Sequence, residues 1–276
     1  MAIIPDFYKN AVVSIGVRQN NSTVQWIGTG FFMVSEVDEQ GRGYPFLVTN
    51  KHVCQNKDHI VIRMREQNTE NLKEVNAILL NEDGSPKYKT HTNQKIDIAV
   101  LPLDGSFITN NHLDFPAFNI ETHAMSSTEL RDNGVTEGSI VYMLGFTMGL
   151  VNRLSSVPIC RMGCVARMSV EQIQENANLL IDIQNFPGNS GSPIITRPEP
   201  ISIRGTKHLS RSVLVGIVHS YIPYREKLIN SQTGEAVEIR SENSGLAYVH
   251  PVEYIKDIID DNMSSKNEGN IPNEGQ

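Results

Sequence analysis

The stretch that decides the fold is PGNSGSP at 187–193, which follows the apolar segment LLIDI at 179–183. Gly188 and Gly191 flank a serine, and glycine tolerates the backbone angles that very tight turns need. A serine in such a turn lies close to backbone N–H groups that point into the same cavity, which is what acyl transfer requires. We therefore predict that Ser190 is a nucleophile and that the N–H groups of Gly188 and Ser190 form an oxyanion hole. The alternative is an ordinary glycine-rich β-turn.

A histidine and an aspartate lie far upstream of this turn, each beside an apolar run. His52 follows the apolar strand candidate in FLVTNKHV at 46–53. An unperturbed imidazole titrates at about pH 6.5, where a general base works well, although a histidine at a strand end is often only structural. Asp97 stands inside KIDIAVL at 95–101, where a carboxylate is costly unless it is paired, and an imidazole N–H would pair it. Asp182 is the rival buried acid, but we expect it to face outward.

Short alternating segments separated by turns recur along the chain. In IVIRMR at 60–65, apolar residues occupy every position of one face and two arginines lie on the other, which is the period of a strand. One helix is expected at 252–262, opened by Pro251. Many short strands without a long amphipathic helix indicate an all-β protein built from barrels or sandwiches. Strands are predicted at 11–17, 24–35, 44–50, 60–65, 96–102, 139–145, 156–168, 178–184 and 212–219.

The composition argues against several classes of function. The chain has 276 residues, of which 39% are hydrophobic, enough to form one large core or two smaller ones. The formal net charge is −7 and Lys and Arg do not cluster, so we expect no nucleic-acid partner. No apolar run approaches the roughly 18 residues of a membrane helix, so we expect no membrane association.

The cysteines and the first residues bear on location and cofactors. Residues 1–8 (MAIIPDFY) lack the basic stretch and the apolar run of a secretory signal. Cys54, Cys160 and Cys164 are an odd number of cysteines, which suits a reducing compartment better than a disulfide framework. Cys160 and Cys164 have no matching Cys or His pair to complete a metal site. We therefore expect a cytoplasmic protein that holds no metal and no other cofactor.

Three strings in the order His, Asp, Ser resemble the motifs of the trypsin superfamily of serine peptidases. The strings at 49–53, 97–101 and 188–193 are similar to the histidine, aspartate and nucleophile motifs of that superfamily. The resemblance extends over about 10–262. Further similar segments lie at 29–32, ahead of the histidine motif, and at 141–150 and 245–251, which resemble bacterial heat-stress proteases.

The resemblance implies an all-β fold of two antiparallel six-stranded β-barrels with a C-terminal helix and an active site in the cleft between the barrels. It implies a serine endopeptidase that works through an acyl-enzyme, with His52 as the base, Asp97 as the group that orients it and Ser190 as the nucleophile. The alternative is a catalytically silent interaction module of the same fold. The implied parts are an N-terminal barrel at 10–115, a connector at 116–136, a second barrel with the helix at 137–262, and a disordered tail at 263–276.

The resemblance also implies where the residue on the acyl side of the cut bond binds. Its pocket would lie between the segment before the nucleophile and the strands near 219–221 and 245–249. Gln184 stands where Arg/Lys-selective relatives have an aspartate, and Tyr221 stands where they have a glycine. Glutamate-selective relatives use a histidine on this strand, which makes His219 a candidate for binding an acidic side chain. We expect little Arg/Lys preference, because Gln184 offers a buried cation no charge; small or medium apolar residues are favoured, with an acidic residue as the alternative.

The residue before the predicted nucleophile bears on how the peptidase activity is regulated. Many relatives have an aspartate there, which pairs with an N-terminus freed by cleavage. Asn189 cannot form that ion pair, so activation by N-terminal cutting is not expected. We expect control by a regulatory protein partner or by ordering of the polar loop at 81–95. The expected partners are thus a protein or peptide substrate and a regulatory protein.

Overall fold

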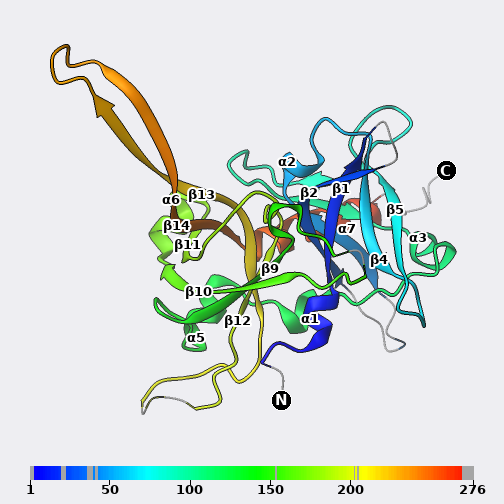
Figure 1. Cartoon of the computed structure of the whole chain (residues 1–276). Helices are drawn as coiled ribbons and strands as arrows, with labels where there is room; N and C mark the ends of the chain where they lie inside the picture. The colour runs from blue at the N-terminus through cyan, green and yellow to red at the C-terminus, as the bar shows by residue number, and fades with distance from the viewer. Residues whose placement is uncertain are drawn as a thin grey trace, which may run out of the picture.

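A computed structural model of the chain describes residues 3–19, 23–35, 40, 43–152, 154–201, 203 and 205–268, with the backbone alone at 264–268. In Figure 1 the chain forms two β-rich halves, with a long hairpin projecting from one of them. The predicted tail at 263–276 falls partly outside the described residues. Helix α7 continues to Glu268, and 269–276 are not described.

The first half is an eight-stranded sheet rich in β-branched and aromatic residues. Its hydrogen-bonded strands follow the order β5-β4-β1-β2-β3-β7-β6, and β8 pairs with β2. The β2–β8 pair is parallel, whereas the predicted barrel was antiparallel throughout. The strands are β1 (Val12–Arg18), β2 (Val24–Ser35), β3 (Tyr44–Thr49), β4 (His59–Arg65), β5 (Leu72–Ile78), β6 (Lys89–Thr90), β7 (Ala99–Pro102) and β8 (Phe118–Asn119).

Among the described residues this sheet does not close, so the six-stranded barrel predicted for this half is not confirmed. Its strand order has two ends, β5 and β6, and no ladder joins them among the described residues. The two ends approach each other where the N–H of Lys87 donates to the carbonyl of Leu79 at 2.8 Å and where Leu80 forms an isolated bridge with Pro86. Proline has no N–H with which to extend that bridge into a ladder.

The second half is the closed six-stranded barrel that was predicted. Its antiparallel order β10-β11-β14-β13-β12-β9 returns to its start through the pairing of β9 with β10. The strands are β9 (Ile140–Gly145), β10 (Ile159–Arg167), β11 (Leu179–Asp182), β12 (Pro193–Thr196), β13 (Leu214–Ile229) and β14 (Ala236–Pro251).

Helices are short except at the C-terminal end. The predicted helix at 252–262 is α7 (Glu253–Glu268), and the connector at 116–136 contains two short helices besides β8. No helix in the described ranges is both long and apolar enough to cross a bilayer. The other helices are α1 (Asp6–Asn10), α2 (Lys51–Cys54), α3 (Gly105–Asn110), α4 (Ile120–His123), α5 (Ser127–Asp132), α6 (Val170–Asn176) and the 3-10 turn η1 (Thr147–Gly149).

One apolar core joins the two halves and α7. It contains Phe31 and Phe118 from the first half, Phe146 and Leu214 from the second, and Ile255 from α7. All five side chains are almost fully buried. Each buried side chain of this size contributes about 1.5–3 kcal/mol. The junction between the halves is therefore a packed core, and the position of one half relative to the other is set by it.

Strands β13 and β14 extend far beyond the barrel. The strand predicted at 212–219 continues to Ile229, and each of the two strands has 16 residues. Their ladder runs out to the pair Ile229 and Ala236. In Figure 1 this hairpin is the orange ribbon that projects from the barrel.

Candidate active site

His52 and Asp97 meet because β3 and β7 are antiparallel neighbours. Thr49 at the end of β3 pairs with Ala99 at the start of β7. The single turn of α2 presents His52 just beyond β3, and Asp97 lies just before β7. The strand predicted at 96–102 thus begins later, at Ala99, and Asp97 belongs to the extended segment that leads into it.

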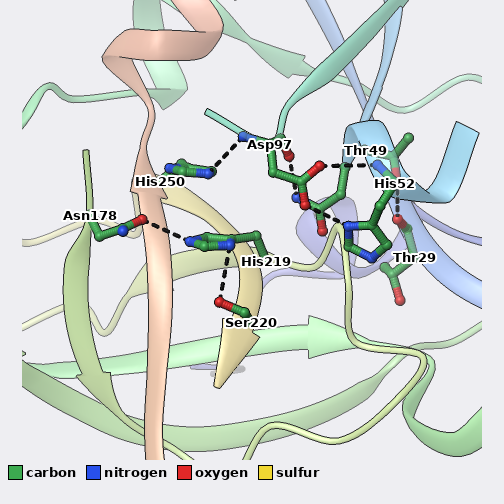
Figure 2. A network of polar contacts seen from close by, with 9 residues as sticks. Thr29, Thr49, His52, Asp97, Asn178, His219, Ser220 and His250 are labelled. Carbon is green, nitrogen blue, oxygen red and sulfur yellow. Dashed lines mark hydrogen bonds and ion pairs between the residues drawn. The ribbon is translucent and has the colours of Figure 1, made fainter. Parts of the chain in front are cut away.

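The contact between the two side chains fixes the histidine tautomer. His52 Nδ1 lies 2.5 Å from Asp97 Oδ2, and the backbone N–H of His52 donates to Oδ1 at 3.0 Å (Figure 2). A carboxylate only accepts, so Nδ1 carries the proton and Nε2 is the basic nitrogen. The imidazole side chain is 48% exposed and the Asp97 side chain 26%. The imidazole of His52 is therefore accessible, while the Asp97 side chain is largely covered.

The charge of Asp97 is stabilised by the same contacts. Burial acts to raise the pKa of the Asp97 carboxyl, but the hydrogen bonds and the positive charge of His52 outweigh burial and lower it below its usual value. His219 adds a smaller lowering effect. Asp97 is therefore ionised at neutral pH, as a group that stabilises an imidazolium must be.

The backbone of Asp97 is held by a second histidine. Its N–H donates to Nε2 of His250 at 2.9 Å (Figure 2), and its carbonyl accepts from the side chain of Asn50 at 2.7 Å. His250 is fully buried, and its Nδ1 lies 2.8 Å from the carbonyl of Ala177. That carbonyl accepts only, so Nδ1 carries the proton and Nε2 is free to accept. The sequence around His250 did not indicate this contact, because the two partners stand 153 positions apart.

The turn that carries Ser190 depends on its glycines. Gly188 and Gly191 have φ of 94° and 88°, in the left-handed region. A Cβ on Gly191 would lie 1.9 Å from the carbonyl oxygen of Thr29, and one on Gly188 would lie 2.5 Å from that of Phe146. A side chain at either position would therefore push the turn away from its neighbours.

Thr29 in β2 fastens this turn to the first half. Its N–H donates to the carbonyl of Ser190 at 2.8 Å, and its hydroxyl donates to the carbonyl of Gly188 at 2.8 Å. The carbonyl of Thr29 in turn accepts from the hydroxyl of Thr49 at 2.7 Å, at the end of the strand that leads to His52 (Figure 2). Thr29 therefore links the turn of Ser190 to the strand that leads to His52.

Gly28 lies between the nucleophile turn and α2. A Cβ there would lie 3.1 Å from the side chain of Val53 and 3.3 Å from the carbonyl oxygen of Ser190. The main chain of Ser190 is therefore close to the residue that follows His52. The structure brings the three predicted catalytic residues to the junction of the halves, with Asp97 and Ser190 contributed by different halves.

Two backbone N–H groups of the turn have no acceptor among the described residues. The N–H groups at 189, 191 and 192 donate to backbone carbonyls at 2.9 to 3.1 Å. Those of Gly188 and Ser190 make no such bond within the described ranges. They are the two groups predicted for the oxyanion hole, and unpaired N–H groups in a tight turn can bind a negatively charged oxygen.

The side chain before the nucleophile points into the protein. Asn189 is fully buried, and its Oδ1 accepts from the hydroxyl of Thr147 at 2.7 Å. A neutral amide at this position is thus bonded to a neutral hydroxyl. The chemistry differs from that of an aspartate paired with a terminal ammonium.

His219 lies in a stack of rings behind Asp97. Its ring is 4.0 Å from that of His250 with 8° between the planes, and Figure 2 shows both rings edge-on. Nε2 lies 2.8 Å from Asn178 Oδ1, and Nδ1 lies 3.1 Å from the Ser220 hydroxyl. Burial, followed by repulsion from His250, lowers the pKa of His219 to about 3. Both ring nitrogens have partners inside the protein, and the role of His219 in holding an acidic side chain stays a prediction.

The other predicted pocket residues are exposed. Tyr221 is 40% exposed on β13 opposite Ala247, and the Gln184 side chain lies beside Gly245. A Cβ on Gly245 would lie 3.5 Å from Gln184 Nε2 and 3.8 Å from Asp182 Oδ1. Asp182 therefore faces outward, near Gln184 and not near His52. A pocket role for Gln184 and Tyr221 stays a prediction.

Comparison with known proteins identifies a family. A family model described as the trypsin-like peptidase domain matches residues 28–199. The match covers more than half of the chain and includes His52, Asp97 and Ser190. No curated protein is significantly similar to the chain. The matched segment and the junction it forms show that this chain belongs to the trypsin-like peptidase family.

Proposed function

We propose that the chain is a serine endopeptidase that cuts peptide bonds through Ser190, His52 and Asp97. Its family supports a protease activity. The observation that carries the proposal is the 2.5 Å contact of His52 Nδ1 with Asp97, which leaves Nε2 as a base. The unoccupied N–H groups of Gly188 and Ser190 add support, because the transition state of acyl transfer needs such donors.

The proposed reaction has two steps. Nε2 of His52 takes the proton of the Ser190 hydroxyl as Oγ bonds to the peptide carbonyl carbon, and the carbonyl oxygen becomes an oxyanion. The N–H groups of Gly188 and Ser190 stabilise that oxyanion by about 3 kcal/mol each. The imidazolium, stabilised by Asp97, gives its proton to the leaving amine as the C–N bond breaks. Water, activated by the same nitrogen, then hydrolyses the acyl-enzyme and restores Ser190.

Labelling by a fluorophosphonate tests the nucleophile. The probe bonds covalently to an activated serine, so the unchanged chain should be labelled and Ser190→Ala should not. The matched control is Ser192→Ala, which removes a buried hydroxyl from the same turn that has no partner among the described residues. Ser192→Ala should keep both labelling and peptide hydrolysis.

The same assay separates the proposal from a silent interaction module of the same fold. Absence of labelling in the folded, unchanged chain would favour the silent module. Labelling that persists in Ser190→Ala would assign the nucleophile to another residue. Hydrolysis of a peptide library, lost in Ser190→Ala, would identify the substrate class as protein or peptide.

We also propose a cytoplasmic location and control without N-terminal cutting. The thiols of Cys54, Cys160 and Cys164 are all free, which supports a reducing compartment. The Asn189–Thr147 bond supports activity in the uncut chain. Cell fractionation tests the location. Labelling of the full-length chain, compared with chains trimmed within the first twelve or so residues, tests the control: a requirement for trimming would contradict it.

Control by loop 81–95, or by a protein partner that orders it, is part of the same proposal. Gln94 Oε1 accepts from the ammonium of Lys51, which precedes His52, at 3.1 Å. Lys95 donates to the carbonyl of Glu175 at 3.1 Å. The end of this loop is therefore attached beside the proposed base, which supports a link between loop order and activity.

A further inference from the structure

The hairpin formed by β13 and β14 continues beyond the barrel as a two-stranded ribbon at 223–243, which we call the arm. Its ladder joins Pro223 to Asn243 at the base and Ile229 to Ala236 at the tip. Every residue at 223–242 is exposed, and Figure 1 shows the arm projecting from the barrel. At about 3.3 Å per residue, its β13 strand is roughly 23 Å long. A ribbon exposed on both faces is only marginally stable alone, and its free edges are templates for another strand.

One edge of the arm begins at the proposed nucleophile. Strand β12 covers the first part of this edge of β13. The nucleophile turn covers the next part, since the N–H of Gly191 donates to the carbonyl of Val218 at 3.0 Å and the N–H of Val218 donates to the carbonyl of Ser192 at 2.9 Å. Beyond Val218, no strand among the described residues pairs with this edge out to Ile229. The open edge therefore runs from Val218, which is bonded to the turn that carries Ser190, to the tip of the arm.

The two faces of the arm carry opposite charge. The ladder between Tyr224 and Leu228 has no irregularity, so side chains alternate strictly between the faces. One face has a net negative charge, even though Arg240 forms an ion pair with Glu238 at 3.2 Å. The other face has two cations and no acid. The negative face carries Tyr224, Glu226, Leu228, Glu238, Arg240 and Glu242, and the positive face carries Arg225, Lys227, Ile239 and Ser241.

We propose that the open edge of β13 along the arm binds an extended segment of the polypeptide substrate, on the acyl side of the cut bond. The segment adds a strand to the arm through backbone hydrogen bonds. The inference rests on the proposed function and on the predicted acyl-side pocket beside Tyr221. Side chains of an added strand alternate between the two faces, so the segment that fits best has basic residues at alternate positions and acidic or apolar residues between them.

Binding of labelled peptides to Ser190→Ala tests this without cleavage. One peptide has an acyl-side extension of about eight residues in which Lys and Asp alternate, and a second has the same residues as a Lys block followed by an Asp block. The alternating peptide should bind about tenfold more tightly, because only its charges sort onto opposite faces of a strand. The same extension on the leaving-group side is the control and should add nothing. Equal affinity of the two acyl-side peptides, or a gain from the control extension alone, would overturn the inference.

Charge reversal locates the binding surface. Glu226→Lys with Glu242→Lys, in the Ser190→Ala background, should abolish the tenfold preference. The matched control is Glu70→Lys with Asp132→Lys, which makes the same change of charge in the β4–β5 turn and at the end of α5. It should keep the preference. A preference that the arm variant leaves unaffected would overturn substrate binding by the arm. An arm variant that changes only the oligomeric state in light scattering would also overturn it and would favour contact between copies of the chain.

The outcome separates this inference from the proposed function. With Ser190 intact, the arm variant should still react with the fluorophosphonate and cleave a short peptide that does not reach the arm. Absence of fluorophosphonate labelling in the unchanged chain would refute the proposed peptidase activity. Normal cleavage of short peptides without any effect of the acyl-side extension would refute the role of the arm alone.

Discussion

Asp97 uses both carboxylate oxygens on His52, one on the ring and one on the backbone N–H. In Asp97→Asn, an amide NH2 facing Nδ1 would favour the tautomer with the proton on Nε2, where the ring cannot act as a base. We expect turnover to fall about 10⁴-fold while the circular dichroism spectrum is unchanged. Steady-state kinetics on a peptide substrate measure this.

The control for that variant is Asp182→Asn. Asp182 is exposed and lies near Gln184, so its substitution should leave turnover unchanged. An inactive Asp182→Asn together with a fully active Asp97→Asn would mean that the catalytic acid is Asp182.

The stacked histidines predict how stability depends on pH. Burial lowers the pKa of His250 as well as that of His219, which falls to about 3, so both rings are neutral in the folded chain. In the unfolded chain they titrate at about 6.5, and the unfolded state therefore gains protons first as the pH falls. The stability that is present above about pH 6.5 should be lost below it, by about 1.4 kcal/mol per pH unit for His219, and the lowered pKa of His250 adds to the loss.

Urea unfolding between about pH 7.5 and 4.5 measures that slope. His219→Gln should remove the contribution of His219 to the pH dependence of the free energy of unfolding. His208→Gln, at an exposed position, is the control and should leave that pH dependence unchanged. A slope that His219→Gln leaves unchanged would mean that the ring does not stay neutral in the fold.

At the scale of elements, the nucleophile turn fits because its glycines have no side chains. Gly191→Ala should place a Cβ 1.9 Å from the carbonyl oxygen of Thr29, so the turn must move. We expect loss of peptide hydrolysis and a decrease of more than about 2 kcal/mol in the free energy of unfolding. Gly84→Ala is the control, with a similar φ of 81° but no atom within 4 Å of the Cβ. It should lose only the roughly 1 kcal/mol of a left-handed alanine and keep activity.

The sequence predicted elements well where burial imposes a pattern. The closed barrel, the C-terminal helix and the strands that lead to the turns of His52 and Ser190 all have apolar runs that reveal them. The arm could not be predicted in this way, because both of its faces are exposed and no alternation of apolar and polar residues indicates its strands. The start of the strand after Asp97 was also placed too early, because an extended segment and a strand have the same apolar pattern.

At the scale of the whole molecule, a shared core predicts that the halves unfold together. Phe31 and Phe118 of the first half pack in one cluster with Phe146 and Ile255. Fluorescence of Trp26, the single tryptophan, reports on β2, and far-ultraviolet circular dichroism reports on both halves. Their urea transitions should coincide. Phe31→Ala should shift both by an equal amount, about 3–5 kcal/mol; separate transitions would mean that the halves fold independently.

The candidate site was only partly predictable for a related reason. His52, Asp97 and Ser190 stand out because each combines a polar group with an apolar strand or a glycine turn. His250 and Thr29 do not, since what they do depends on contacts between distant parts of the chain. The gap between β5 and β6 in the first half was not predicted either, because it depends on a single bridge, between Leu80 and Pro86, that is not extended into a ladder.

The position of His250 in the chain has a consequence for biosynthesis. A ribosome has synthesised all three proposed catalytic residues once it has passed Ser190, yet β14 is translated later, after the hairpin turn. The barrel closes only when β14 takes its place between β11 and β13, and the same strand brings the acceptor for the N–H of Asp97. A growing chain therefore holds His52, Asp97 and Ser190 before His250 is in place to accept from the backbone N–H of Asp97. On the proposed function, the order of translation therefore delays cutting until β14 has been made, which would protect the nascent chain and its neighbours on the polysome.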